Sequence, residues 1–293
     1  MIYEIAKGYK GDYTIFRPYA PENNRESWEA LPQKLKKDLL TWGEKHLGYE
    51  YPWIPATRYM EFCRIGNRAN FESLYFARRR ALNALVMAEC TEGKGKFLDE
   101  IINGIMSICE ESGWQLPAHN HNGKGEFECL PDNSNPVMDL FACETGAQLS
   151  MVAYLLKSQL DAVSPLIIKR IYNELTVRIL NPYLSTHFGW MGEYGESVNN
   201  WTPWCTQNTL ITIFSMEGIE REIKQRVLEQ AAKSLDIFLN VYGEDGCCNE
   251  GASYYRAAGL CLFNAIEVMN AVTTDEFVSL YQNNKIRNIA PIF

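Results

Sequence analysis

The sequence predicts an all-α protein in which antiparallel helical hairpins form an incomplete (α/α) toroid. Apolar residues recur at intervals of three and four along most of the chain, which is the spacing of one helix face. Short polar turns separate the helical segments, and alternating strand patterns with Asn-Gly or Asp-Gly turns are nearly absent. Because the hairpins share no fixed-period consensus, we expect a ring of divergent hairpins rather than a repeat solenoid.

The predicted helices belong to a single domain that spans residues 1–293, with residues 1–50 as an N-terminal helical extension. The extension carries a helix over residues 26–46 that ends before Gly48. The apolar positions of this helix are Trp28, Leu31, Leu35, Leu39 and Trp42. The later helices are predicted in pairs, which are 70–90 with 96–111, 137–160 with 165–184, 202–216 with 220–242, and 252–272 with 275–282.

Composition limits the classes of function. The hydrophobic fraction of 46% is enough for one large core. The formal charge of −8 argues against non-specific binding of nucleic acid, which needs a basic surface. The sequence shows no signal peptide and no apolar run of about twenty residues, so we expect no membrane interaction. Nine cysteines, an odd number found mostly in helical apolar runs, predict reduced, buried thiols and a cytoplasmic protein.

Basic residues gather in one region of the sequence. Arg58, Arg64, Arg68 and the arginine run at 78–80 form its only dense group of positive charge. A solvated helix face is the simpler interpretation of the run. A basic cleft for an acidic substrate is the alternative.

Three connections are long for an all-helical domain and rich in polar or aromatic residues: 114–136, 186–204 and 243–251. A rigid helical scaffold can present side chains of such loops into one cleft, so we expect the functional site there. In the first connection, we expect His119 to form hydrogen bonds in the cleft and His121 to be solvated. Alternate residues of an extended segment point in opposite directions, and these two histidines have no further ligands at suitable spacing, so no metal or cofactor is expected.

The second connection is dense in aromatic residues. Trp190, Tyr194, Trp201 and Trp204 lie among amide side chains. Flat aromatic faces beside amides suit the stacking of sugar rings, whereas the alternative is that these rings pack the loop against the helices.

The same connection ends in a helix-start signal, in which Thr202 is the expected N-cap and Pro203 the first helical residue. In the third connection, a turn is expected to precede a helix that begins near Glu250. Tyr254 and Tyr255 would then lie in its first turns, where a helix N-terminus favours developing negative charge. The alternative for either tyrosine is an ordinary half-buried aromatic residue.

Five motifs follow one another along the chain: RIGNRANFESLYFARRRALNAL, WQLPAHN, MDLFACETG, NNWTPW and DGCCNEGASYYRAAG. In their order, residues 55–272 resemble the heparinase II/III-like polysaccharide lyases. The resemblance implies that an asparagine or histidine on a helical toroid neutralises the carboxylate of a uronic acid, and that a tyrosine about one hairpin later acts as general acid and often as base. It also implies a β-sandwich domain after the toroid, so either this chain is a fragment or the protein lacks that half of the site.

Matched by motif, the resemblance assigns the first role to Asn200, with Asn199 as the alternative, and the second to Tyr254, with Tyr255 as the alternative. The expected partner is an acidic polysaccharide or oligosaccharide. The substrate-binding candidates are His119, Asn199, Trp201, Trp204, Glu250, Tyr255 and Arg64.

The chemistry of β-elimination explains these residue types. Removal of the C5 proton of a uronic acid is slow while the adjacent carboxylate stays anionic, so hydrogen bonds to that carboxylate stabilise the enolate-like intermediate. A tyrosine can take the proton as phenolate or protonate the departing O4.

Two other functions are compatible with the sequence. One is an inverting glycoside hydrolase on a similar toroid, with two carboxylates separated by a water molecule. Its candidate carboxylates are Glu193, Glu196, Asp245 and Glu250. The other is a non-catalytic carbohydrate-binding domain.

Overall fold

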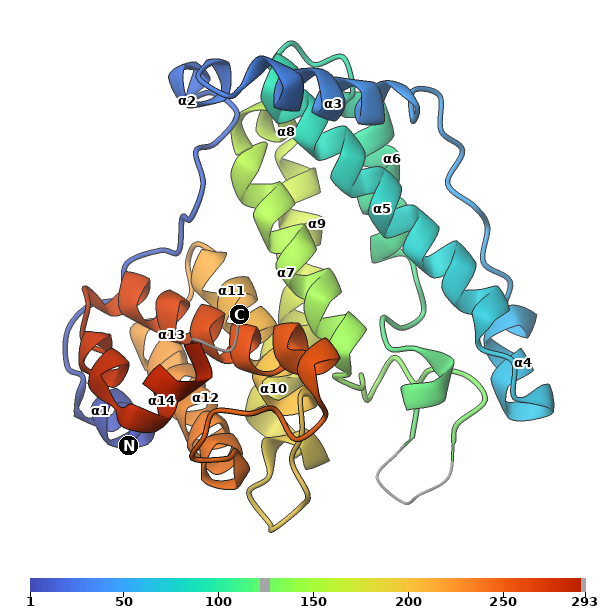
Figure 1. The fold of residues 1–293 in the computed structure, drawn as a ribbon. Coiled ribbons are helices and arrows are strands. Elements are labelled where there is room, and N and C mark those ends of the chain that lie inside the picture. Colours follow the sequence, from blue (N-terminus) through green and yellow to red (C-terminus); the bar gives the residue numbers. More distant parts are fainter. Residues whose placement is uncertain (122–126, 291–293) are drawn as a thin grey trace. The chain divides into compact units, whose positions relative to one another are not determined.

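Helices and loops make up the protein in the computed structural model, which describes residues 1–121 and 127–290 (Figure 1). Within these residues there is no strand, and an isolated β-bridge joins His121 to Phe127. The all-α prediction is therefore confirmed. The chain divides into two compact units: unit 1 contains residues 1–16, 138–147 and 179–293, and unit 2 contains residues 17–137 and 148–178. Five residues of the first long connection, 122–126, lie outside the described residues.

Unit 2 is organised around the helix α5 (Ala69–Glu92), which packs against α3 (Gln33–Glu44) and α6 (Leu98–Cys109). Helices α3 and α5 approach closely at Gly43, where an added Cβ would lie 2.2 Å from the Cβ of Ala88. The other elements confined to unit 2 are α2 (Arg25–Glu29), α4 (Ala56–Ile65), the 3₁₀ turn η1 (Pro117–His119), α8 (Lys157–Val163) and α9 (Pro165–Leu175).

In unit 1, α11 (Trp201–Ser215) packs against both α12 (Arg221–Val241) and α13 (Gly259–Thr273). The N-terminal helix α1 (Ile2–Gly8) packs on α12, where the Asp236 carboxylate accepts hydrogen bonds from the first three backbone nitrogens of the chain. A carboxylate at this end stabilises the helix. The remaining elements of unit 1 are α10 (Asn181–Ser185), η3 (Gly189–Met191), η4 (Ala252–Ala257), η5 (Val278–Gln282) and α14 (Asn284–Ile289).

Helix α7 (Leu140–Leu155) begins in unit 1 and ends in unit 2. The buried Asp139 caps it by accepting hydrogen bonds from the backbone nitrogens of Phe141 and Ala142 at 3.1 and 2.7 Å. A π-helical turn, Thr176–Leu180, joins α9 to α10. Pro182 explains this irregularity, because its ring would clash with the carbonyl four residues earlier in a regular α-helix.

Several predicted boundaries are wrong for identifiable reasons. The helix predicted over 26–46 is two helices, because Pro32 interrupts it and becomes the N-cap of α3. Its expected apolar face is only partly buried, since Leu35 and Trp42 are 41% and 54% exposed. The helix predicted over 137–160 ends at Leu155, and α8 follows it. Residues 275–282 contain a 3₁₀ turn rather than an α-helix.

The arginine run at 78–80 is not a solvated helix face. Arg78 and Arg79 are buried, and both bind the Glu111 carboxylate, at 3.1 and 2.7 Å. Only Arg80 is exposed. Because Arg78 and Arg79 are buried and both bind Glu111, the run does not form an open basic cleft either.

All nine cysteines are free thiols. The prediction of buried thiols is confirmed for Cys90, Cys109, Cys143, Cys205 and Cys261. Cys63, Cys129 and Cys247 are exposed instead, and Cys248 is partly exposed. No helix in residues 1–121 and 127–290 has the length and apolar character needed to cross a membrane.

Candidate functional site

The second and third long connections meet at a hydrogen-bonded pair in unit 1. The Asn200 side-chain amide donates to Glu250 Oε1 at 2.6 Å, and the Asn200 backbone nitrogen donates to Glu250 Oε2 at 3.1 Å. Asn200 is 5% exposed, whereas Glu250 is exposed. Since a carboxylate only accepts hydrogen bonds, the contact fixes the amide with its nitrogen toward Glu250. The second N–H of this amide is not used by Glu250.

The two neighbouring asparagines have different roles at the start of α11. The Asn199 side-chain oxygen accepts a hydrogen bond from the Trp201 backbone nitrogen at 2.9 Å, which is an Asx turn around the N-cap residue Asn200. The expected N-cap role of Thr202 is wrong, because the helix begins at Trp201 and the Thr202 hydroxyl donates to the Trp190 carbonyl at 2.7 Å. Asn199 therefore forms the turn at the start of the helix, whereas Asn200 is the N-cap residue and its side chain faces Glu250.

Tyr254 and Tyr255 lie in the 3₁₀ turn η4, not in the first turns of an α-helix as expected, because α13 begins only at Gly259. Neither tyrosine therefore lies at the N-terminus of an α-helix. Tyr254 is 48% exposed. The Tyr255 ring lies against Gly259, where an added Cβ would come within 2.7 Å of it, and burial raises the pKa of its hydroxyl. Tyr254 is thus the more accessible of the two phenols.

The third connection is anchored to α14. Gly246 has a φ of +80°, and an added Cβ would lie 2.1 Å from the Asn288 carbonyl oxygen. Lys285 donates to the carbonyl oxygens of Leu239 and Tyr242, at 2.8 and 3.0 Å. These contacts fix the turn that precedes Glu250, and no other residue type fits at Gly246 without a shift of the backbone.

The aromatic residues of the second connection divide into packing and accessible groups. Trp190 is buried, stacks on Phe188 at 6.0 Å between ring centroids, and donates its indole N–H to the Met138 carbonyl at 2.8 Å. It packs the loop against the scaffold. Trp201 and Trp204 are partly exposed, and Tyr194 is 78% exposed.

Glu144 of the MDLFACETG motif also reaches this part of unit 1. The Trp204 indole N–H donates to Glu144 Oε1 at 2.8 Å, and the Trp204 ring meets the edge of Phe141 at 6.0 Å. The carboxylate fixes the orientation of the indole on α11. The sequence alone does not single out Glu144, although it lies within one of the five motifs.

His187 is a second residue that the sequence did not single out. Its Nε2 lies 2.5 Å from Glu196 Oε1, its Nδ1 lies 3.9 Å from Glu193 Oε2, and its ring centroid lies 4.3 Å from that of Tyr194. Desolvation raises the pKa of Glu196, but the hydrogen bonds from His187 and from backbone N–H groups outweigh it and lower the pKa below 4.5. In the sequence, the indication of this cluster is a histidine that lies within ten residues of two glutamates in one loop.

The two other candidates belong to unit 2. His119 ends the short turn η1 and is partly exposed, and Arg64 is exposed near the end of α4. Their participation in the same site as Asn200 stays a prediction. His121, expected to be solvated, is exposed and meets the Phe127 ring edge-on at 6.1 Å. In the described part of the chain, no three His, Cys, Asp or Glu side chains are grouped so as to hold a metal ion.

Comparison with known proteins adds no family assignment: no protein-family model and no curated protein matches this chain.

Proposed function

We propose that this protein is a polysaccharide lyase, or the toroid half of one, that acts by β-elimination on a uronic-acid-containing polysaccharide or oligosaccharide. The hydrogen-bonded pair of Asn200 and Glu250 carries the proposal, because it brings together two of the five motifs that resemble the heparinase II/III-like family, NNWTPW and DGCCNEGASYYRAAG. In this proposal the helical hairpins form an incomplete toroid, and a further β-sandwich domain completes the cleft.

Asn200 is suited to binding the substrate carboxylate. Glu250 holds one N–H of its amide, and the second N–H is the donor for the uronate. Hydrogen bonding to that carboxylate lowers the barrier to removal of the C5 proton, since the negative charge spreads onto its oxygens. Glu250 acts here by positioning Asn200, and because Glu250 is exposed, water screens its repulsion of the substrate.

Tyr254 is the proposed proton-transfer residue. It follows Glu250 by four positions, it is half exposed, and its turn η4 contacts α11. The phenolate form would remove the C5 proton, and the phenol would return a proton to the departing O4. Trp201 and Trp204 supply aromatic surface on the same helix, α11.

The hydrolase alternative has less support from the site. The Glu196 carboxylate is bound to His187, Glu250 to Asn200, and Asp245 to the backbone nitrogen of Cys247. Each of these three carboxylates therefore already has a hydrogen-bond partner, and no two of them form an evident pair of general acid and general base.

Product analysis separates the candidate functions. The longest natural form of the protein is incubated with uronate polysaccharides of known linkage. The assay follows the ultraviolet absorbance of the unsaturated uronate that a lyase produces. Tyr254→Phe is expected to lower kcat by roughly 10²-fold or more with little change in binding, because it removes the transferable proton but keeps the ring. Tyr255→Phe is the matched control and is expected to retain turnover.

Three outcomes would redirect the assignment. A new reducing end without the unsaturated product would select the hydrolase. Binding without turnover would select a carbohydrate-binding domain. Full activity of Tyr254→Phe together with an inactive Tyr255→Phe would transfer the role to Tyr255.

A further inference from the structure

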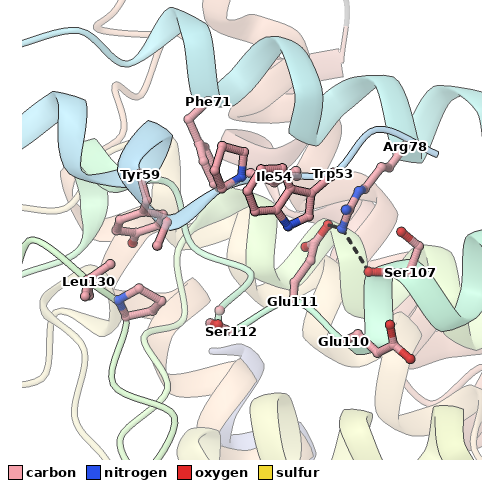
Figure 2. A pocket seen from close by; sticks show the side chains of 14 residues that line it. Trp53, Ile54, Tyr59, Phe71, Arg78, Ser107, Glu110, Glu111, Ser112 and Leu130 are labelled. Carbon is pink, nitrogen blue, oxygen red and sulfur yellow. Dashed lines mark hydrogen bonds and ion pairs between the residues drawn. The ribbon is translucent and has the colours of Figure 1, made fainter.

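Unit 2 contains a pocket of about 370 Å³ that includes none of the candidate residues above (Figure 2). It opens beside α4 and the start of α5, and its size lies within the range of small-molecule sites. Figure 2 shows the rings of Trp53, Tyr59 and Phe71 on one side of the space, with the polar side chains of Glu110 and Ser112 on the other.

The positive charge in the wall of this pocket is already used. Arg78 donates from Nε and Nη2 to the Pro52 carbonyl at 3.0 and 2.6 Å, and from Nη1 to the Ser107 carbonyl at 2.9 Å and to Glu111 at 3.1 Å. The Glu111 side chain is only 7% exposed and also binds Arg79. Arg78 therefore directs its nitrogens at protein acceptors rather than into the pocket, and it shares the Glu111 carboxylate with Arg79.

Three other groups lining the pocket are available. Trp53 is 81% exposed, and among the described residues its indole has neither a ring partner nor a hydrogen-bond partner. In the same part of the chain, the exposed Glu110 carboxylate and Ser112 hydroxyl form no side-chain hydrogen bond or ion pair. The accessible features are thus an aromatic face, an unpaired negative charge and a hydroxyl.

We infer that this pocket binds a small organic cation of the alkylammonium class. The face of an indole ring attracts a cation, and a nearby carboxylate adds Coulomb attraction. The apolar part of the ligand would lie against Phe71 and Leu130, and Ser112 can accept a hydrogen bond from a ligand that carries N–H or O–H groups. This inference is independent of the lyase proposal, because it uses only residues of unit 2.

Calorimetric titration of the whole chain at low ionic strength tests the inference with two probes of equal shape. Choline carries a quaternary ammonium, and 3,3-dimethyl-1-butanol replaces its nitrogen by carbon and has no charge. Choline is expected to bind about tenfold more tightly, since the two cation-selective interactions act together. Glucose is the third probe and represents a neutral sugar that could stack on Trp53.

Two variants and one control locate the binding. Trp53→Leu and Glu110→Gln are each expected to weaken choline binding by about fivefold or more. Both side chains are exposed, so the fold is expected to persist, which circular dichroism verifies. Glu26→Gln makes the same charge change on α2, at the opposite end of unit 2 from α4 (Figure 1), and is expected to leave binding unchanged.

The inference is overturned if choline does not bind, if the neutral isostere binds equally well, or if Glu110→Gln binds choline as the parent does. Tighter binding of glucose than of choline would make the pocket a sugar site instead.

Discussion

Asn200 illustrates how one buried amide can connect a helix start to a distant loop. Its backbone and side-chain nitrogens both donate to Glu250, fifty residues later in the chain. An unsatisfied buried amide costs roughly 1–3 kcal/mol, so the carboxylate stabilises the junction as well as fixing the direction of the amide. Asn200 is the N-cap residue of α11 but makes no side-chain capping bond, and Asn199 supplies the side-chain contact at the helix start, which leaves the Asn200 side chain available for Glu250.

The pair formed by His187 and Glu196 makes the second connection sensitive to acid. Because the folded-state pKa of Glu196 is lowered below 4.5, its ionised form stabilises the loop above pH 4.5. That contribution is lost as the pH falls below 4.5 and through the folded-state pKa. We expect the amide of Tyr194, which donates to Glu196 at 2.9 Å, to lose hydrogen-exchange protection in this acidic range.

Hydrogen exchange of residues 186–200 as a function of pH measures this effect. Glu196→Gln is expected to remove the acid-dependent step, and Glu222→Gln, an exposed carboxylate on α12, is expected to keep it. An unchanged step in Glu196→Gln would assign the acid sensitivity to another group.

At the scale of the element, the sequence predicted helices well wherever the apolar pattern is local. The segments expected at 70–90, 202–216 and 220–242 match α5, α11 and α12 to within a few residues. Helix α1 was missed, because its capping group is Asp236 on α12 and no nearby residue signals a start. The apolar periodicity of residues 26–46 continues through Pro32, whereas the helix does not, because proline has no N–H to donate and its ring clashes with the preceding turn.

The candidate site was predictable only in part, because its geometry also depends on contacts between residues that are distant in sequence. Loop length and aromatic content identified the connections, and two of them meet in unit 1 through Asn200 and Glu250. Which carboxylate faces which partner depends on contacts distant in sequence. The burial of Arg78 and Arg79 against Glu111 is another such contact, and a charge run alone does not reveal it.

The packing of α3 on α5 gives a prediction for one glycine. Gly43→Ala would place a methyl group 2.2 Å from the Cβ of Ala88, closer than real atoms approach, so the helices must separate. We expect a loss of about 1–3 kcal/mol in the free energy of unfolding, despite the better helix propensity of alanine. Urea unfolding followed by circular dichroism measures it. Lys37→Ala on the exposed face of α3 is the control, with an expected change within about 0.5 kcal/mol, and equal stabilities of both variants would contradict the close packing.

At the scale of the whole molecule, both units are discontinuous in sequence. Unit 1 combines the first sixteen residues with residues 138–147 and 179–293, and unit 2 takes the segments between them. Each unit therefore needs contacts between residues far apart in the chain. In unit 1, for example, the Phe16 backbone nitrogen donates a hydrogen bond to the Phe214 carbonyl oxygen at 2.8 Å. A cut at a single boundary cannot release either unit intact.

The distribution of the nine thiols over the molecule provides the last prediction. Iodoacetamide applied to the native protein is expected to modify Cys63, Cys129 and Cys247 first, and the five buried cysteines only after denaturation. Desolvation and the neighbouring Cys129 raise the pKa of Cys63 to about 11, and Asp245 raises that of Cys247. Because the thiolate is the reactive form, modification of Cys63 is expected to accelerate as the pH rises toward about 11. Peptide mass spectrometry measures the extent of modification at each cysteine. Rapid native labelling of Cys143 or Cys205 would contradict the buried core of unit 1, and fewer than nine modified residues in the denatured, unreduced protein would contradict the free state of all thiols.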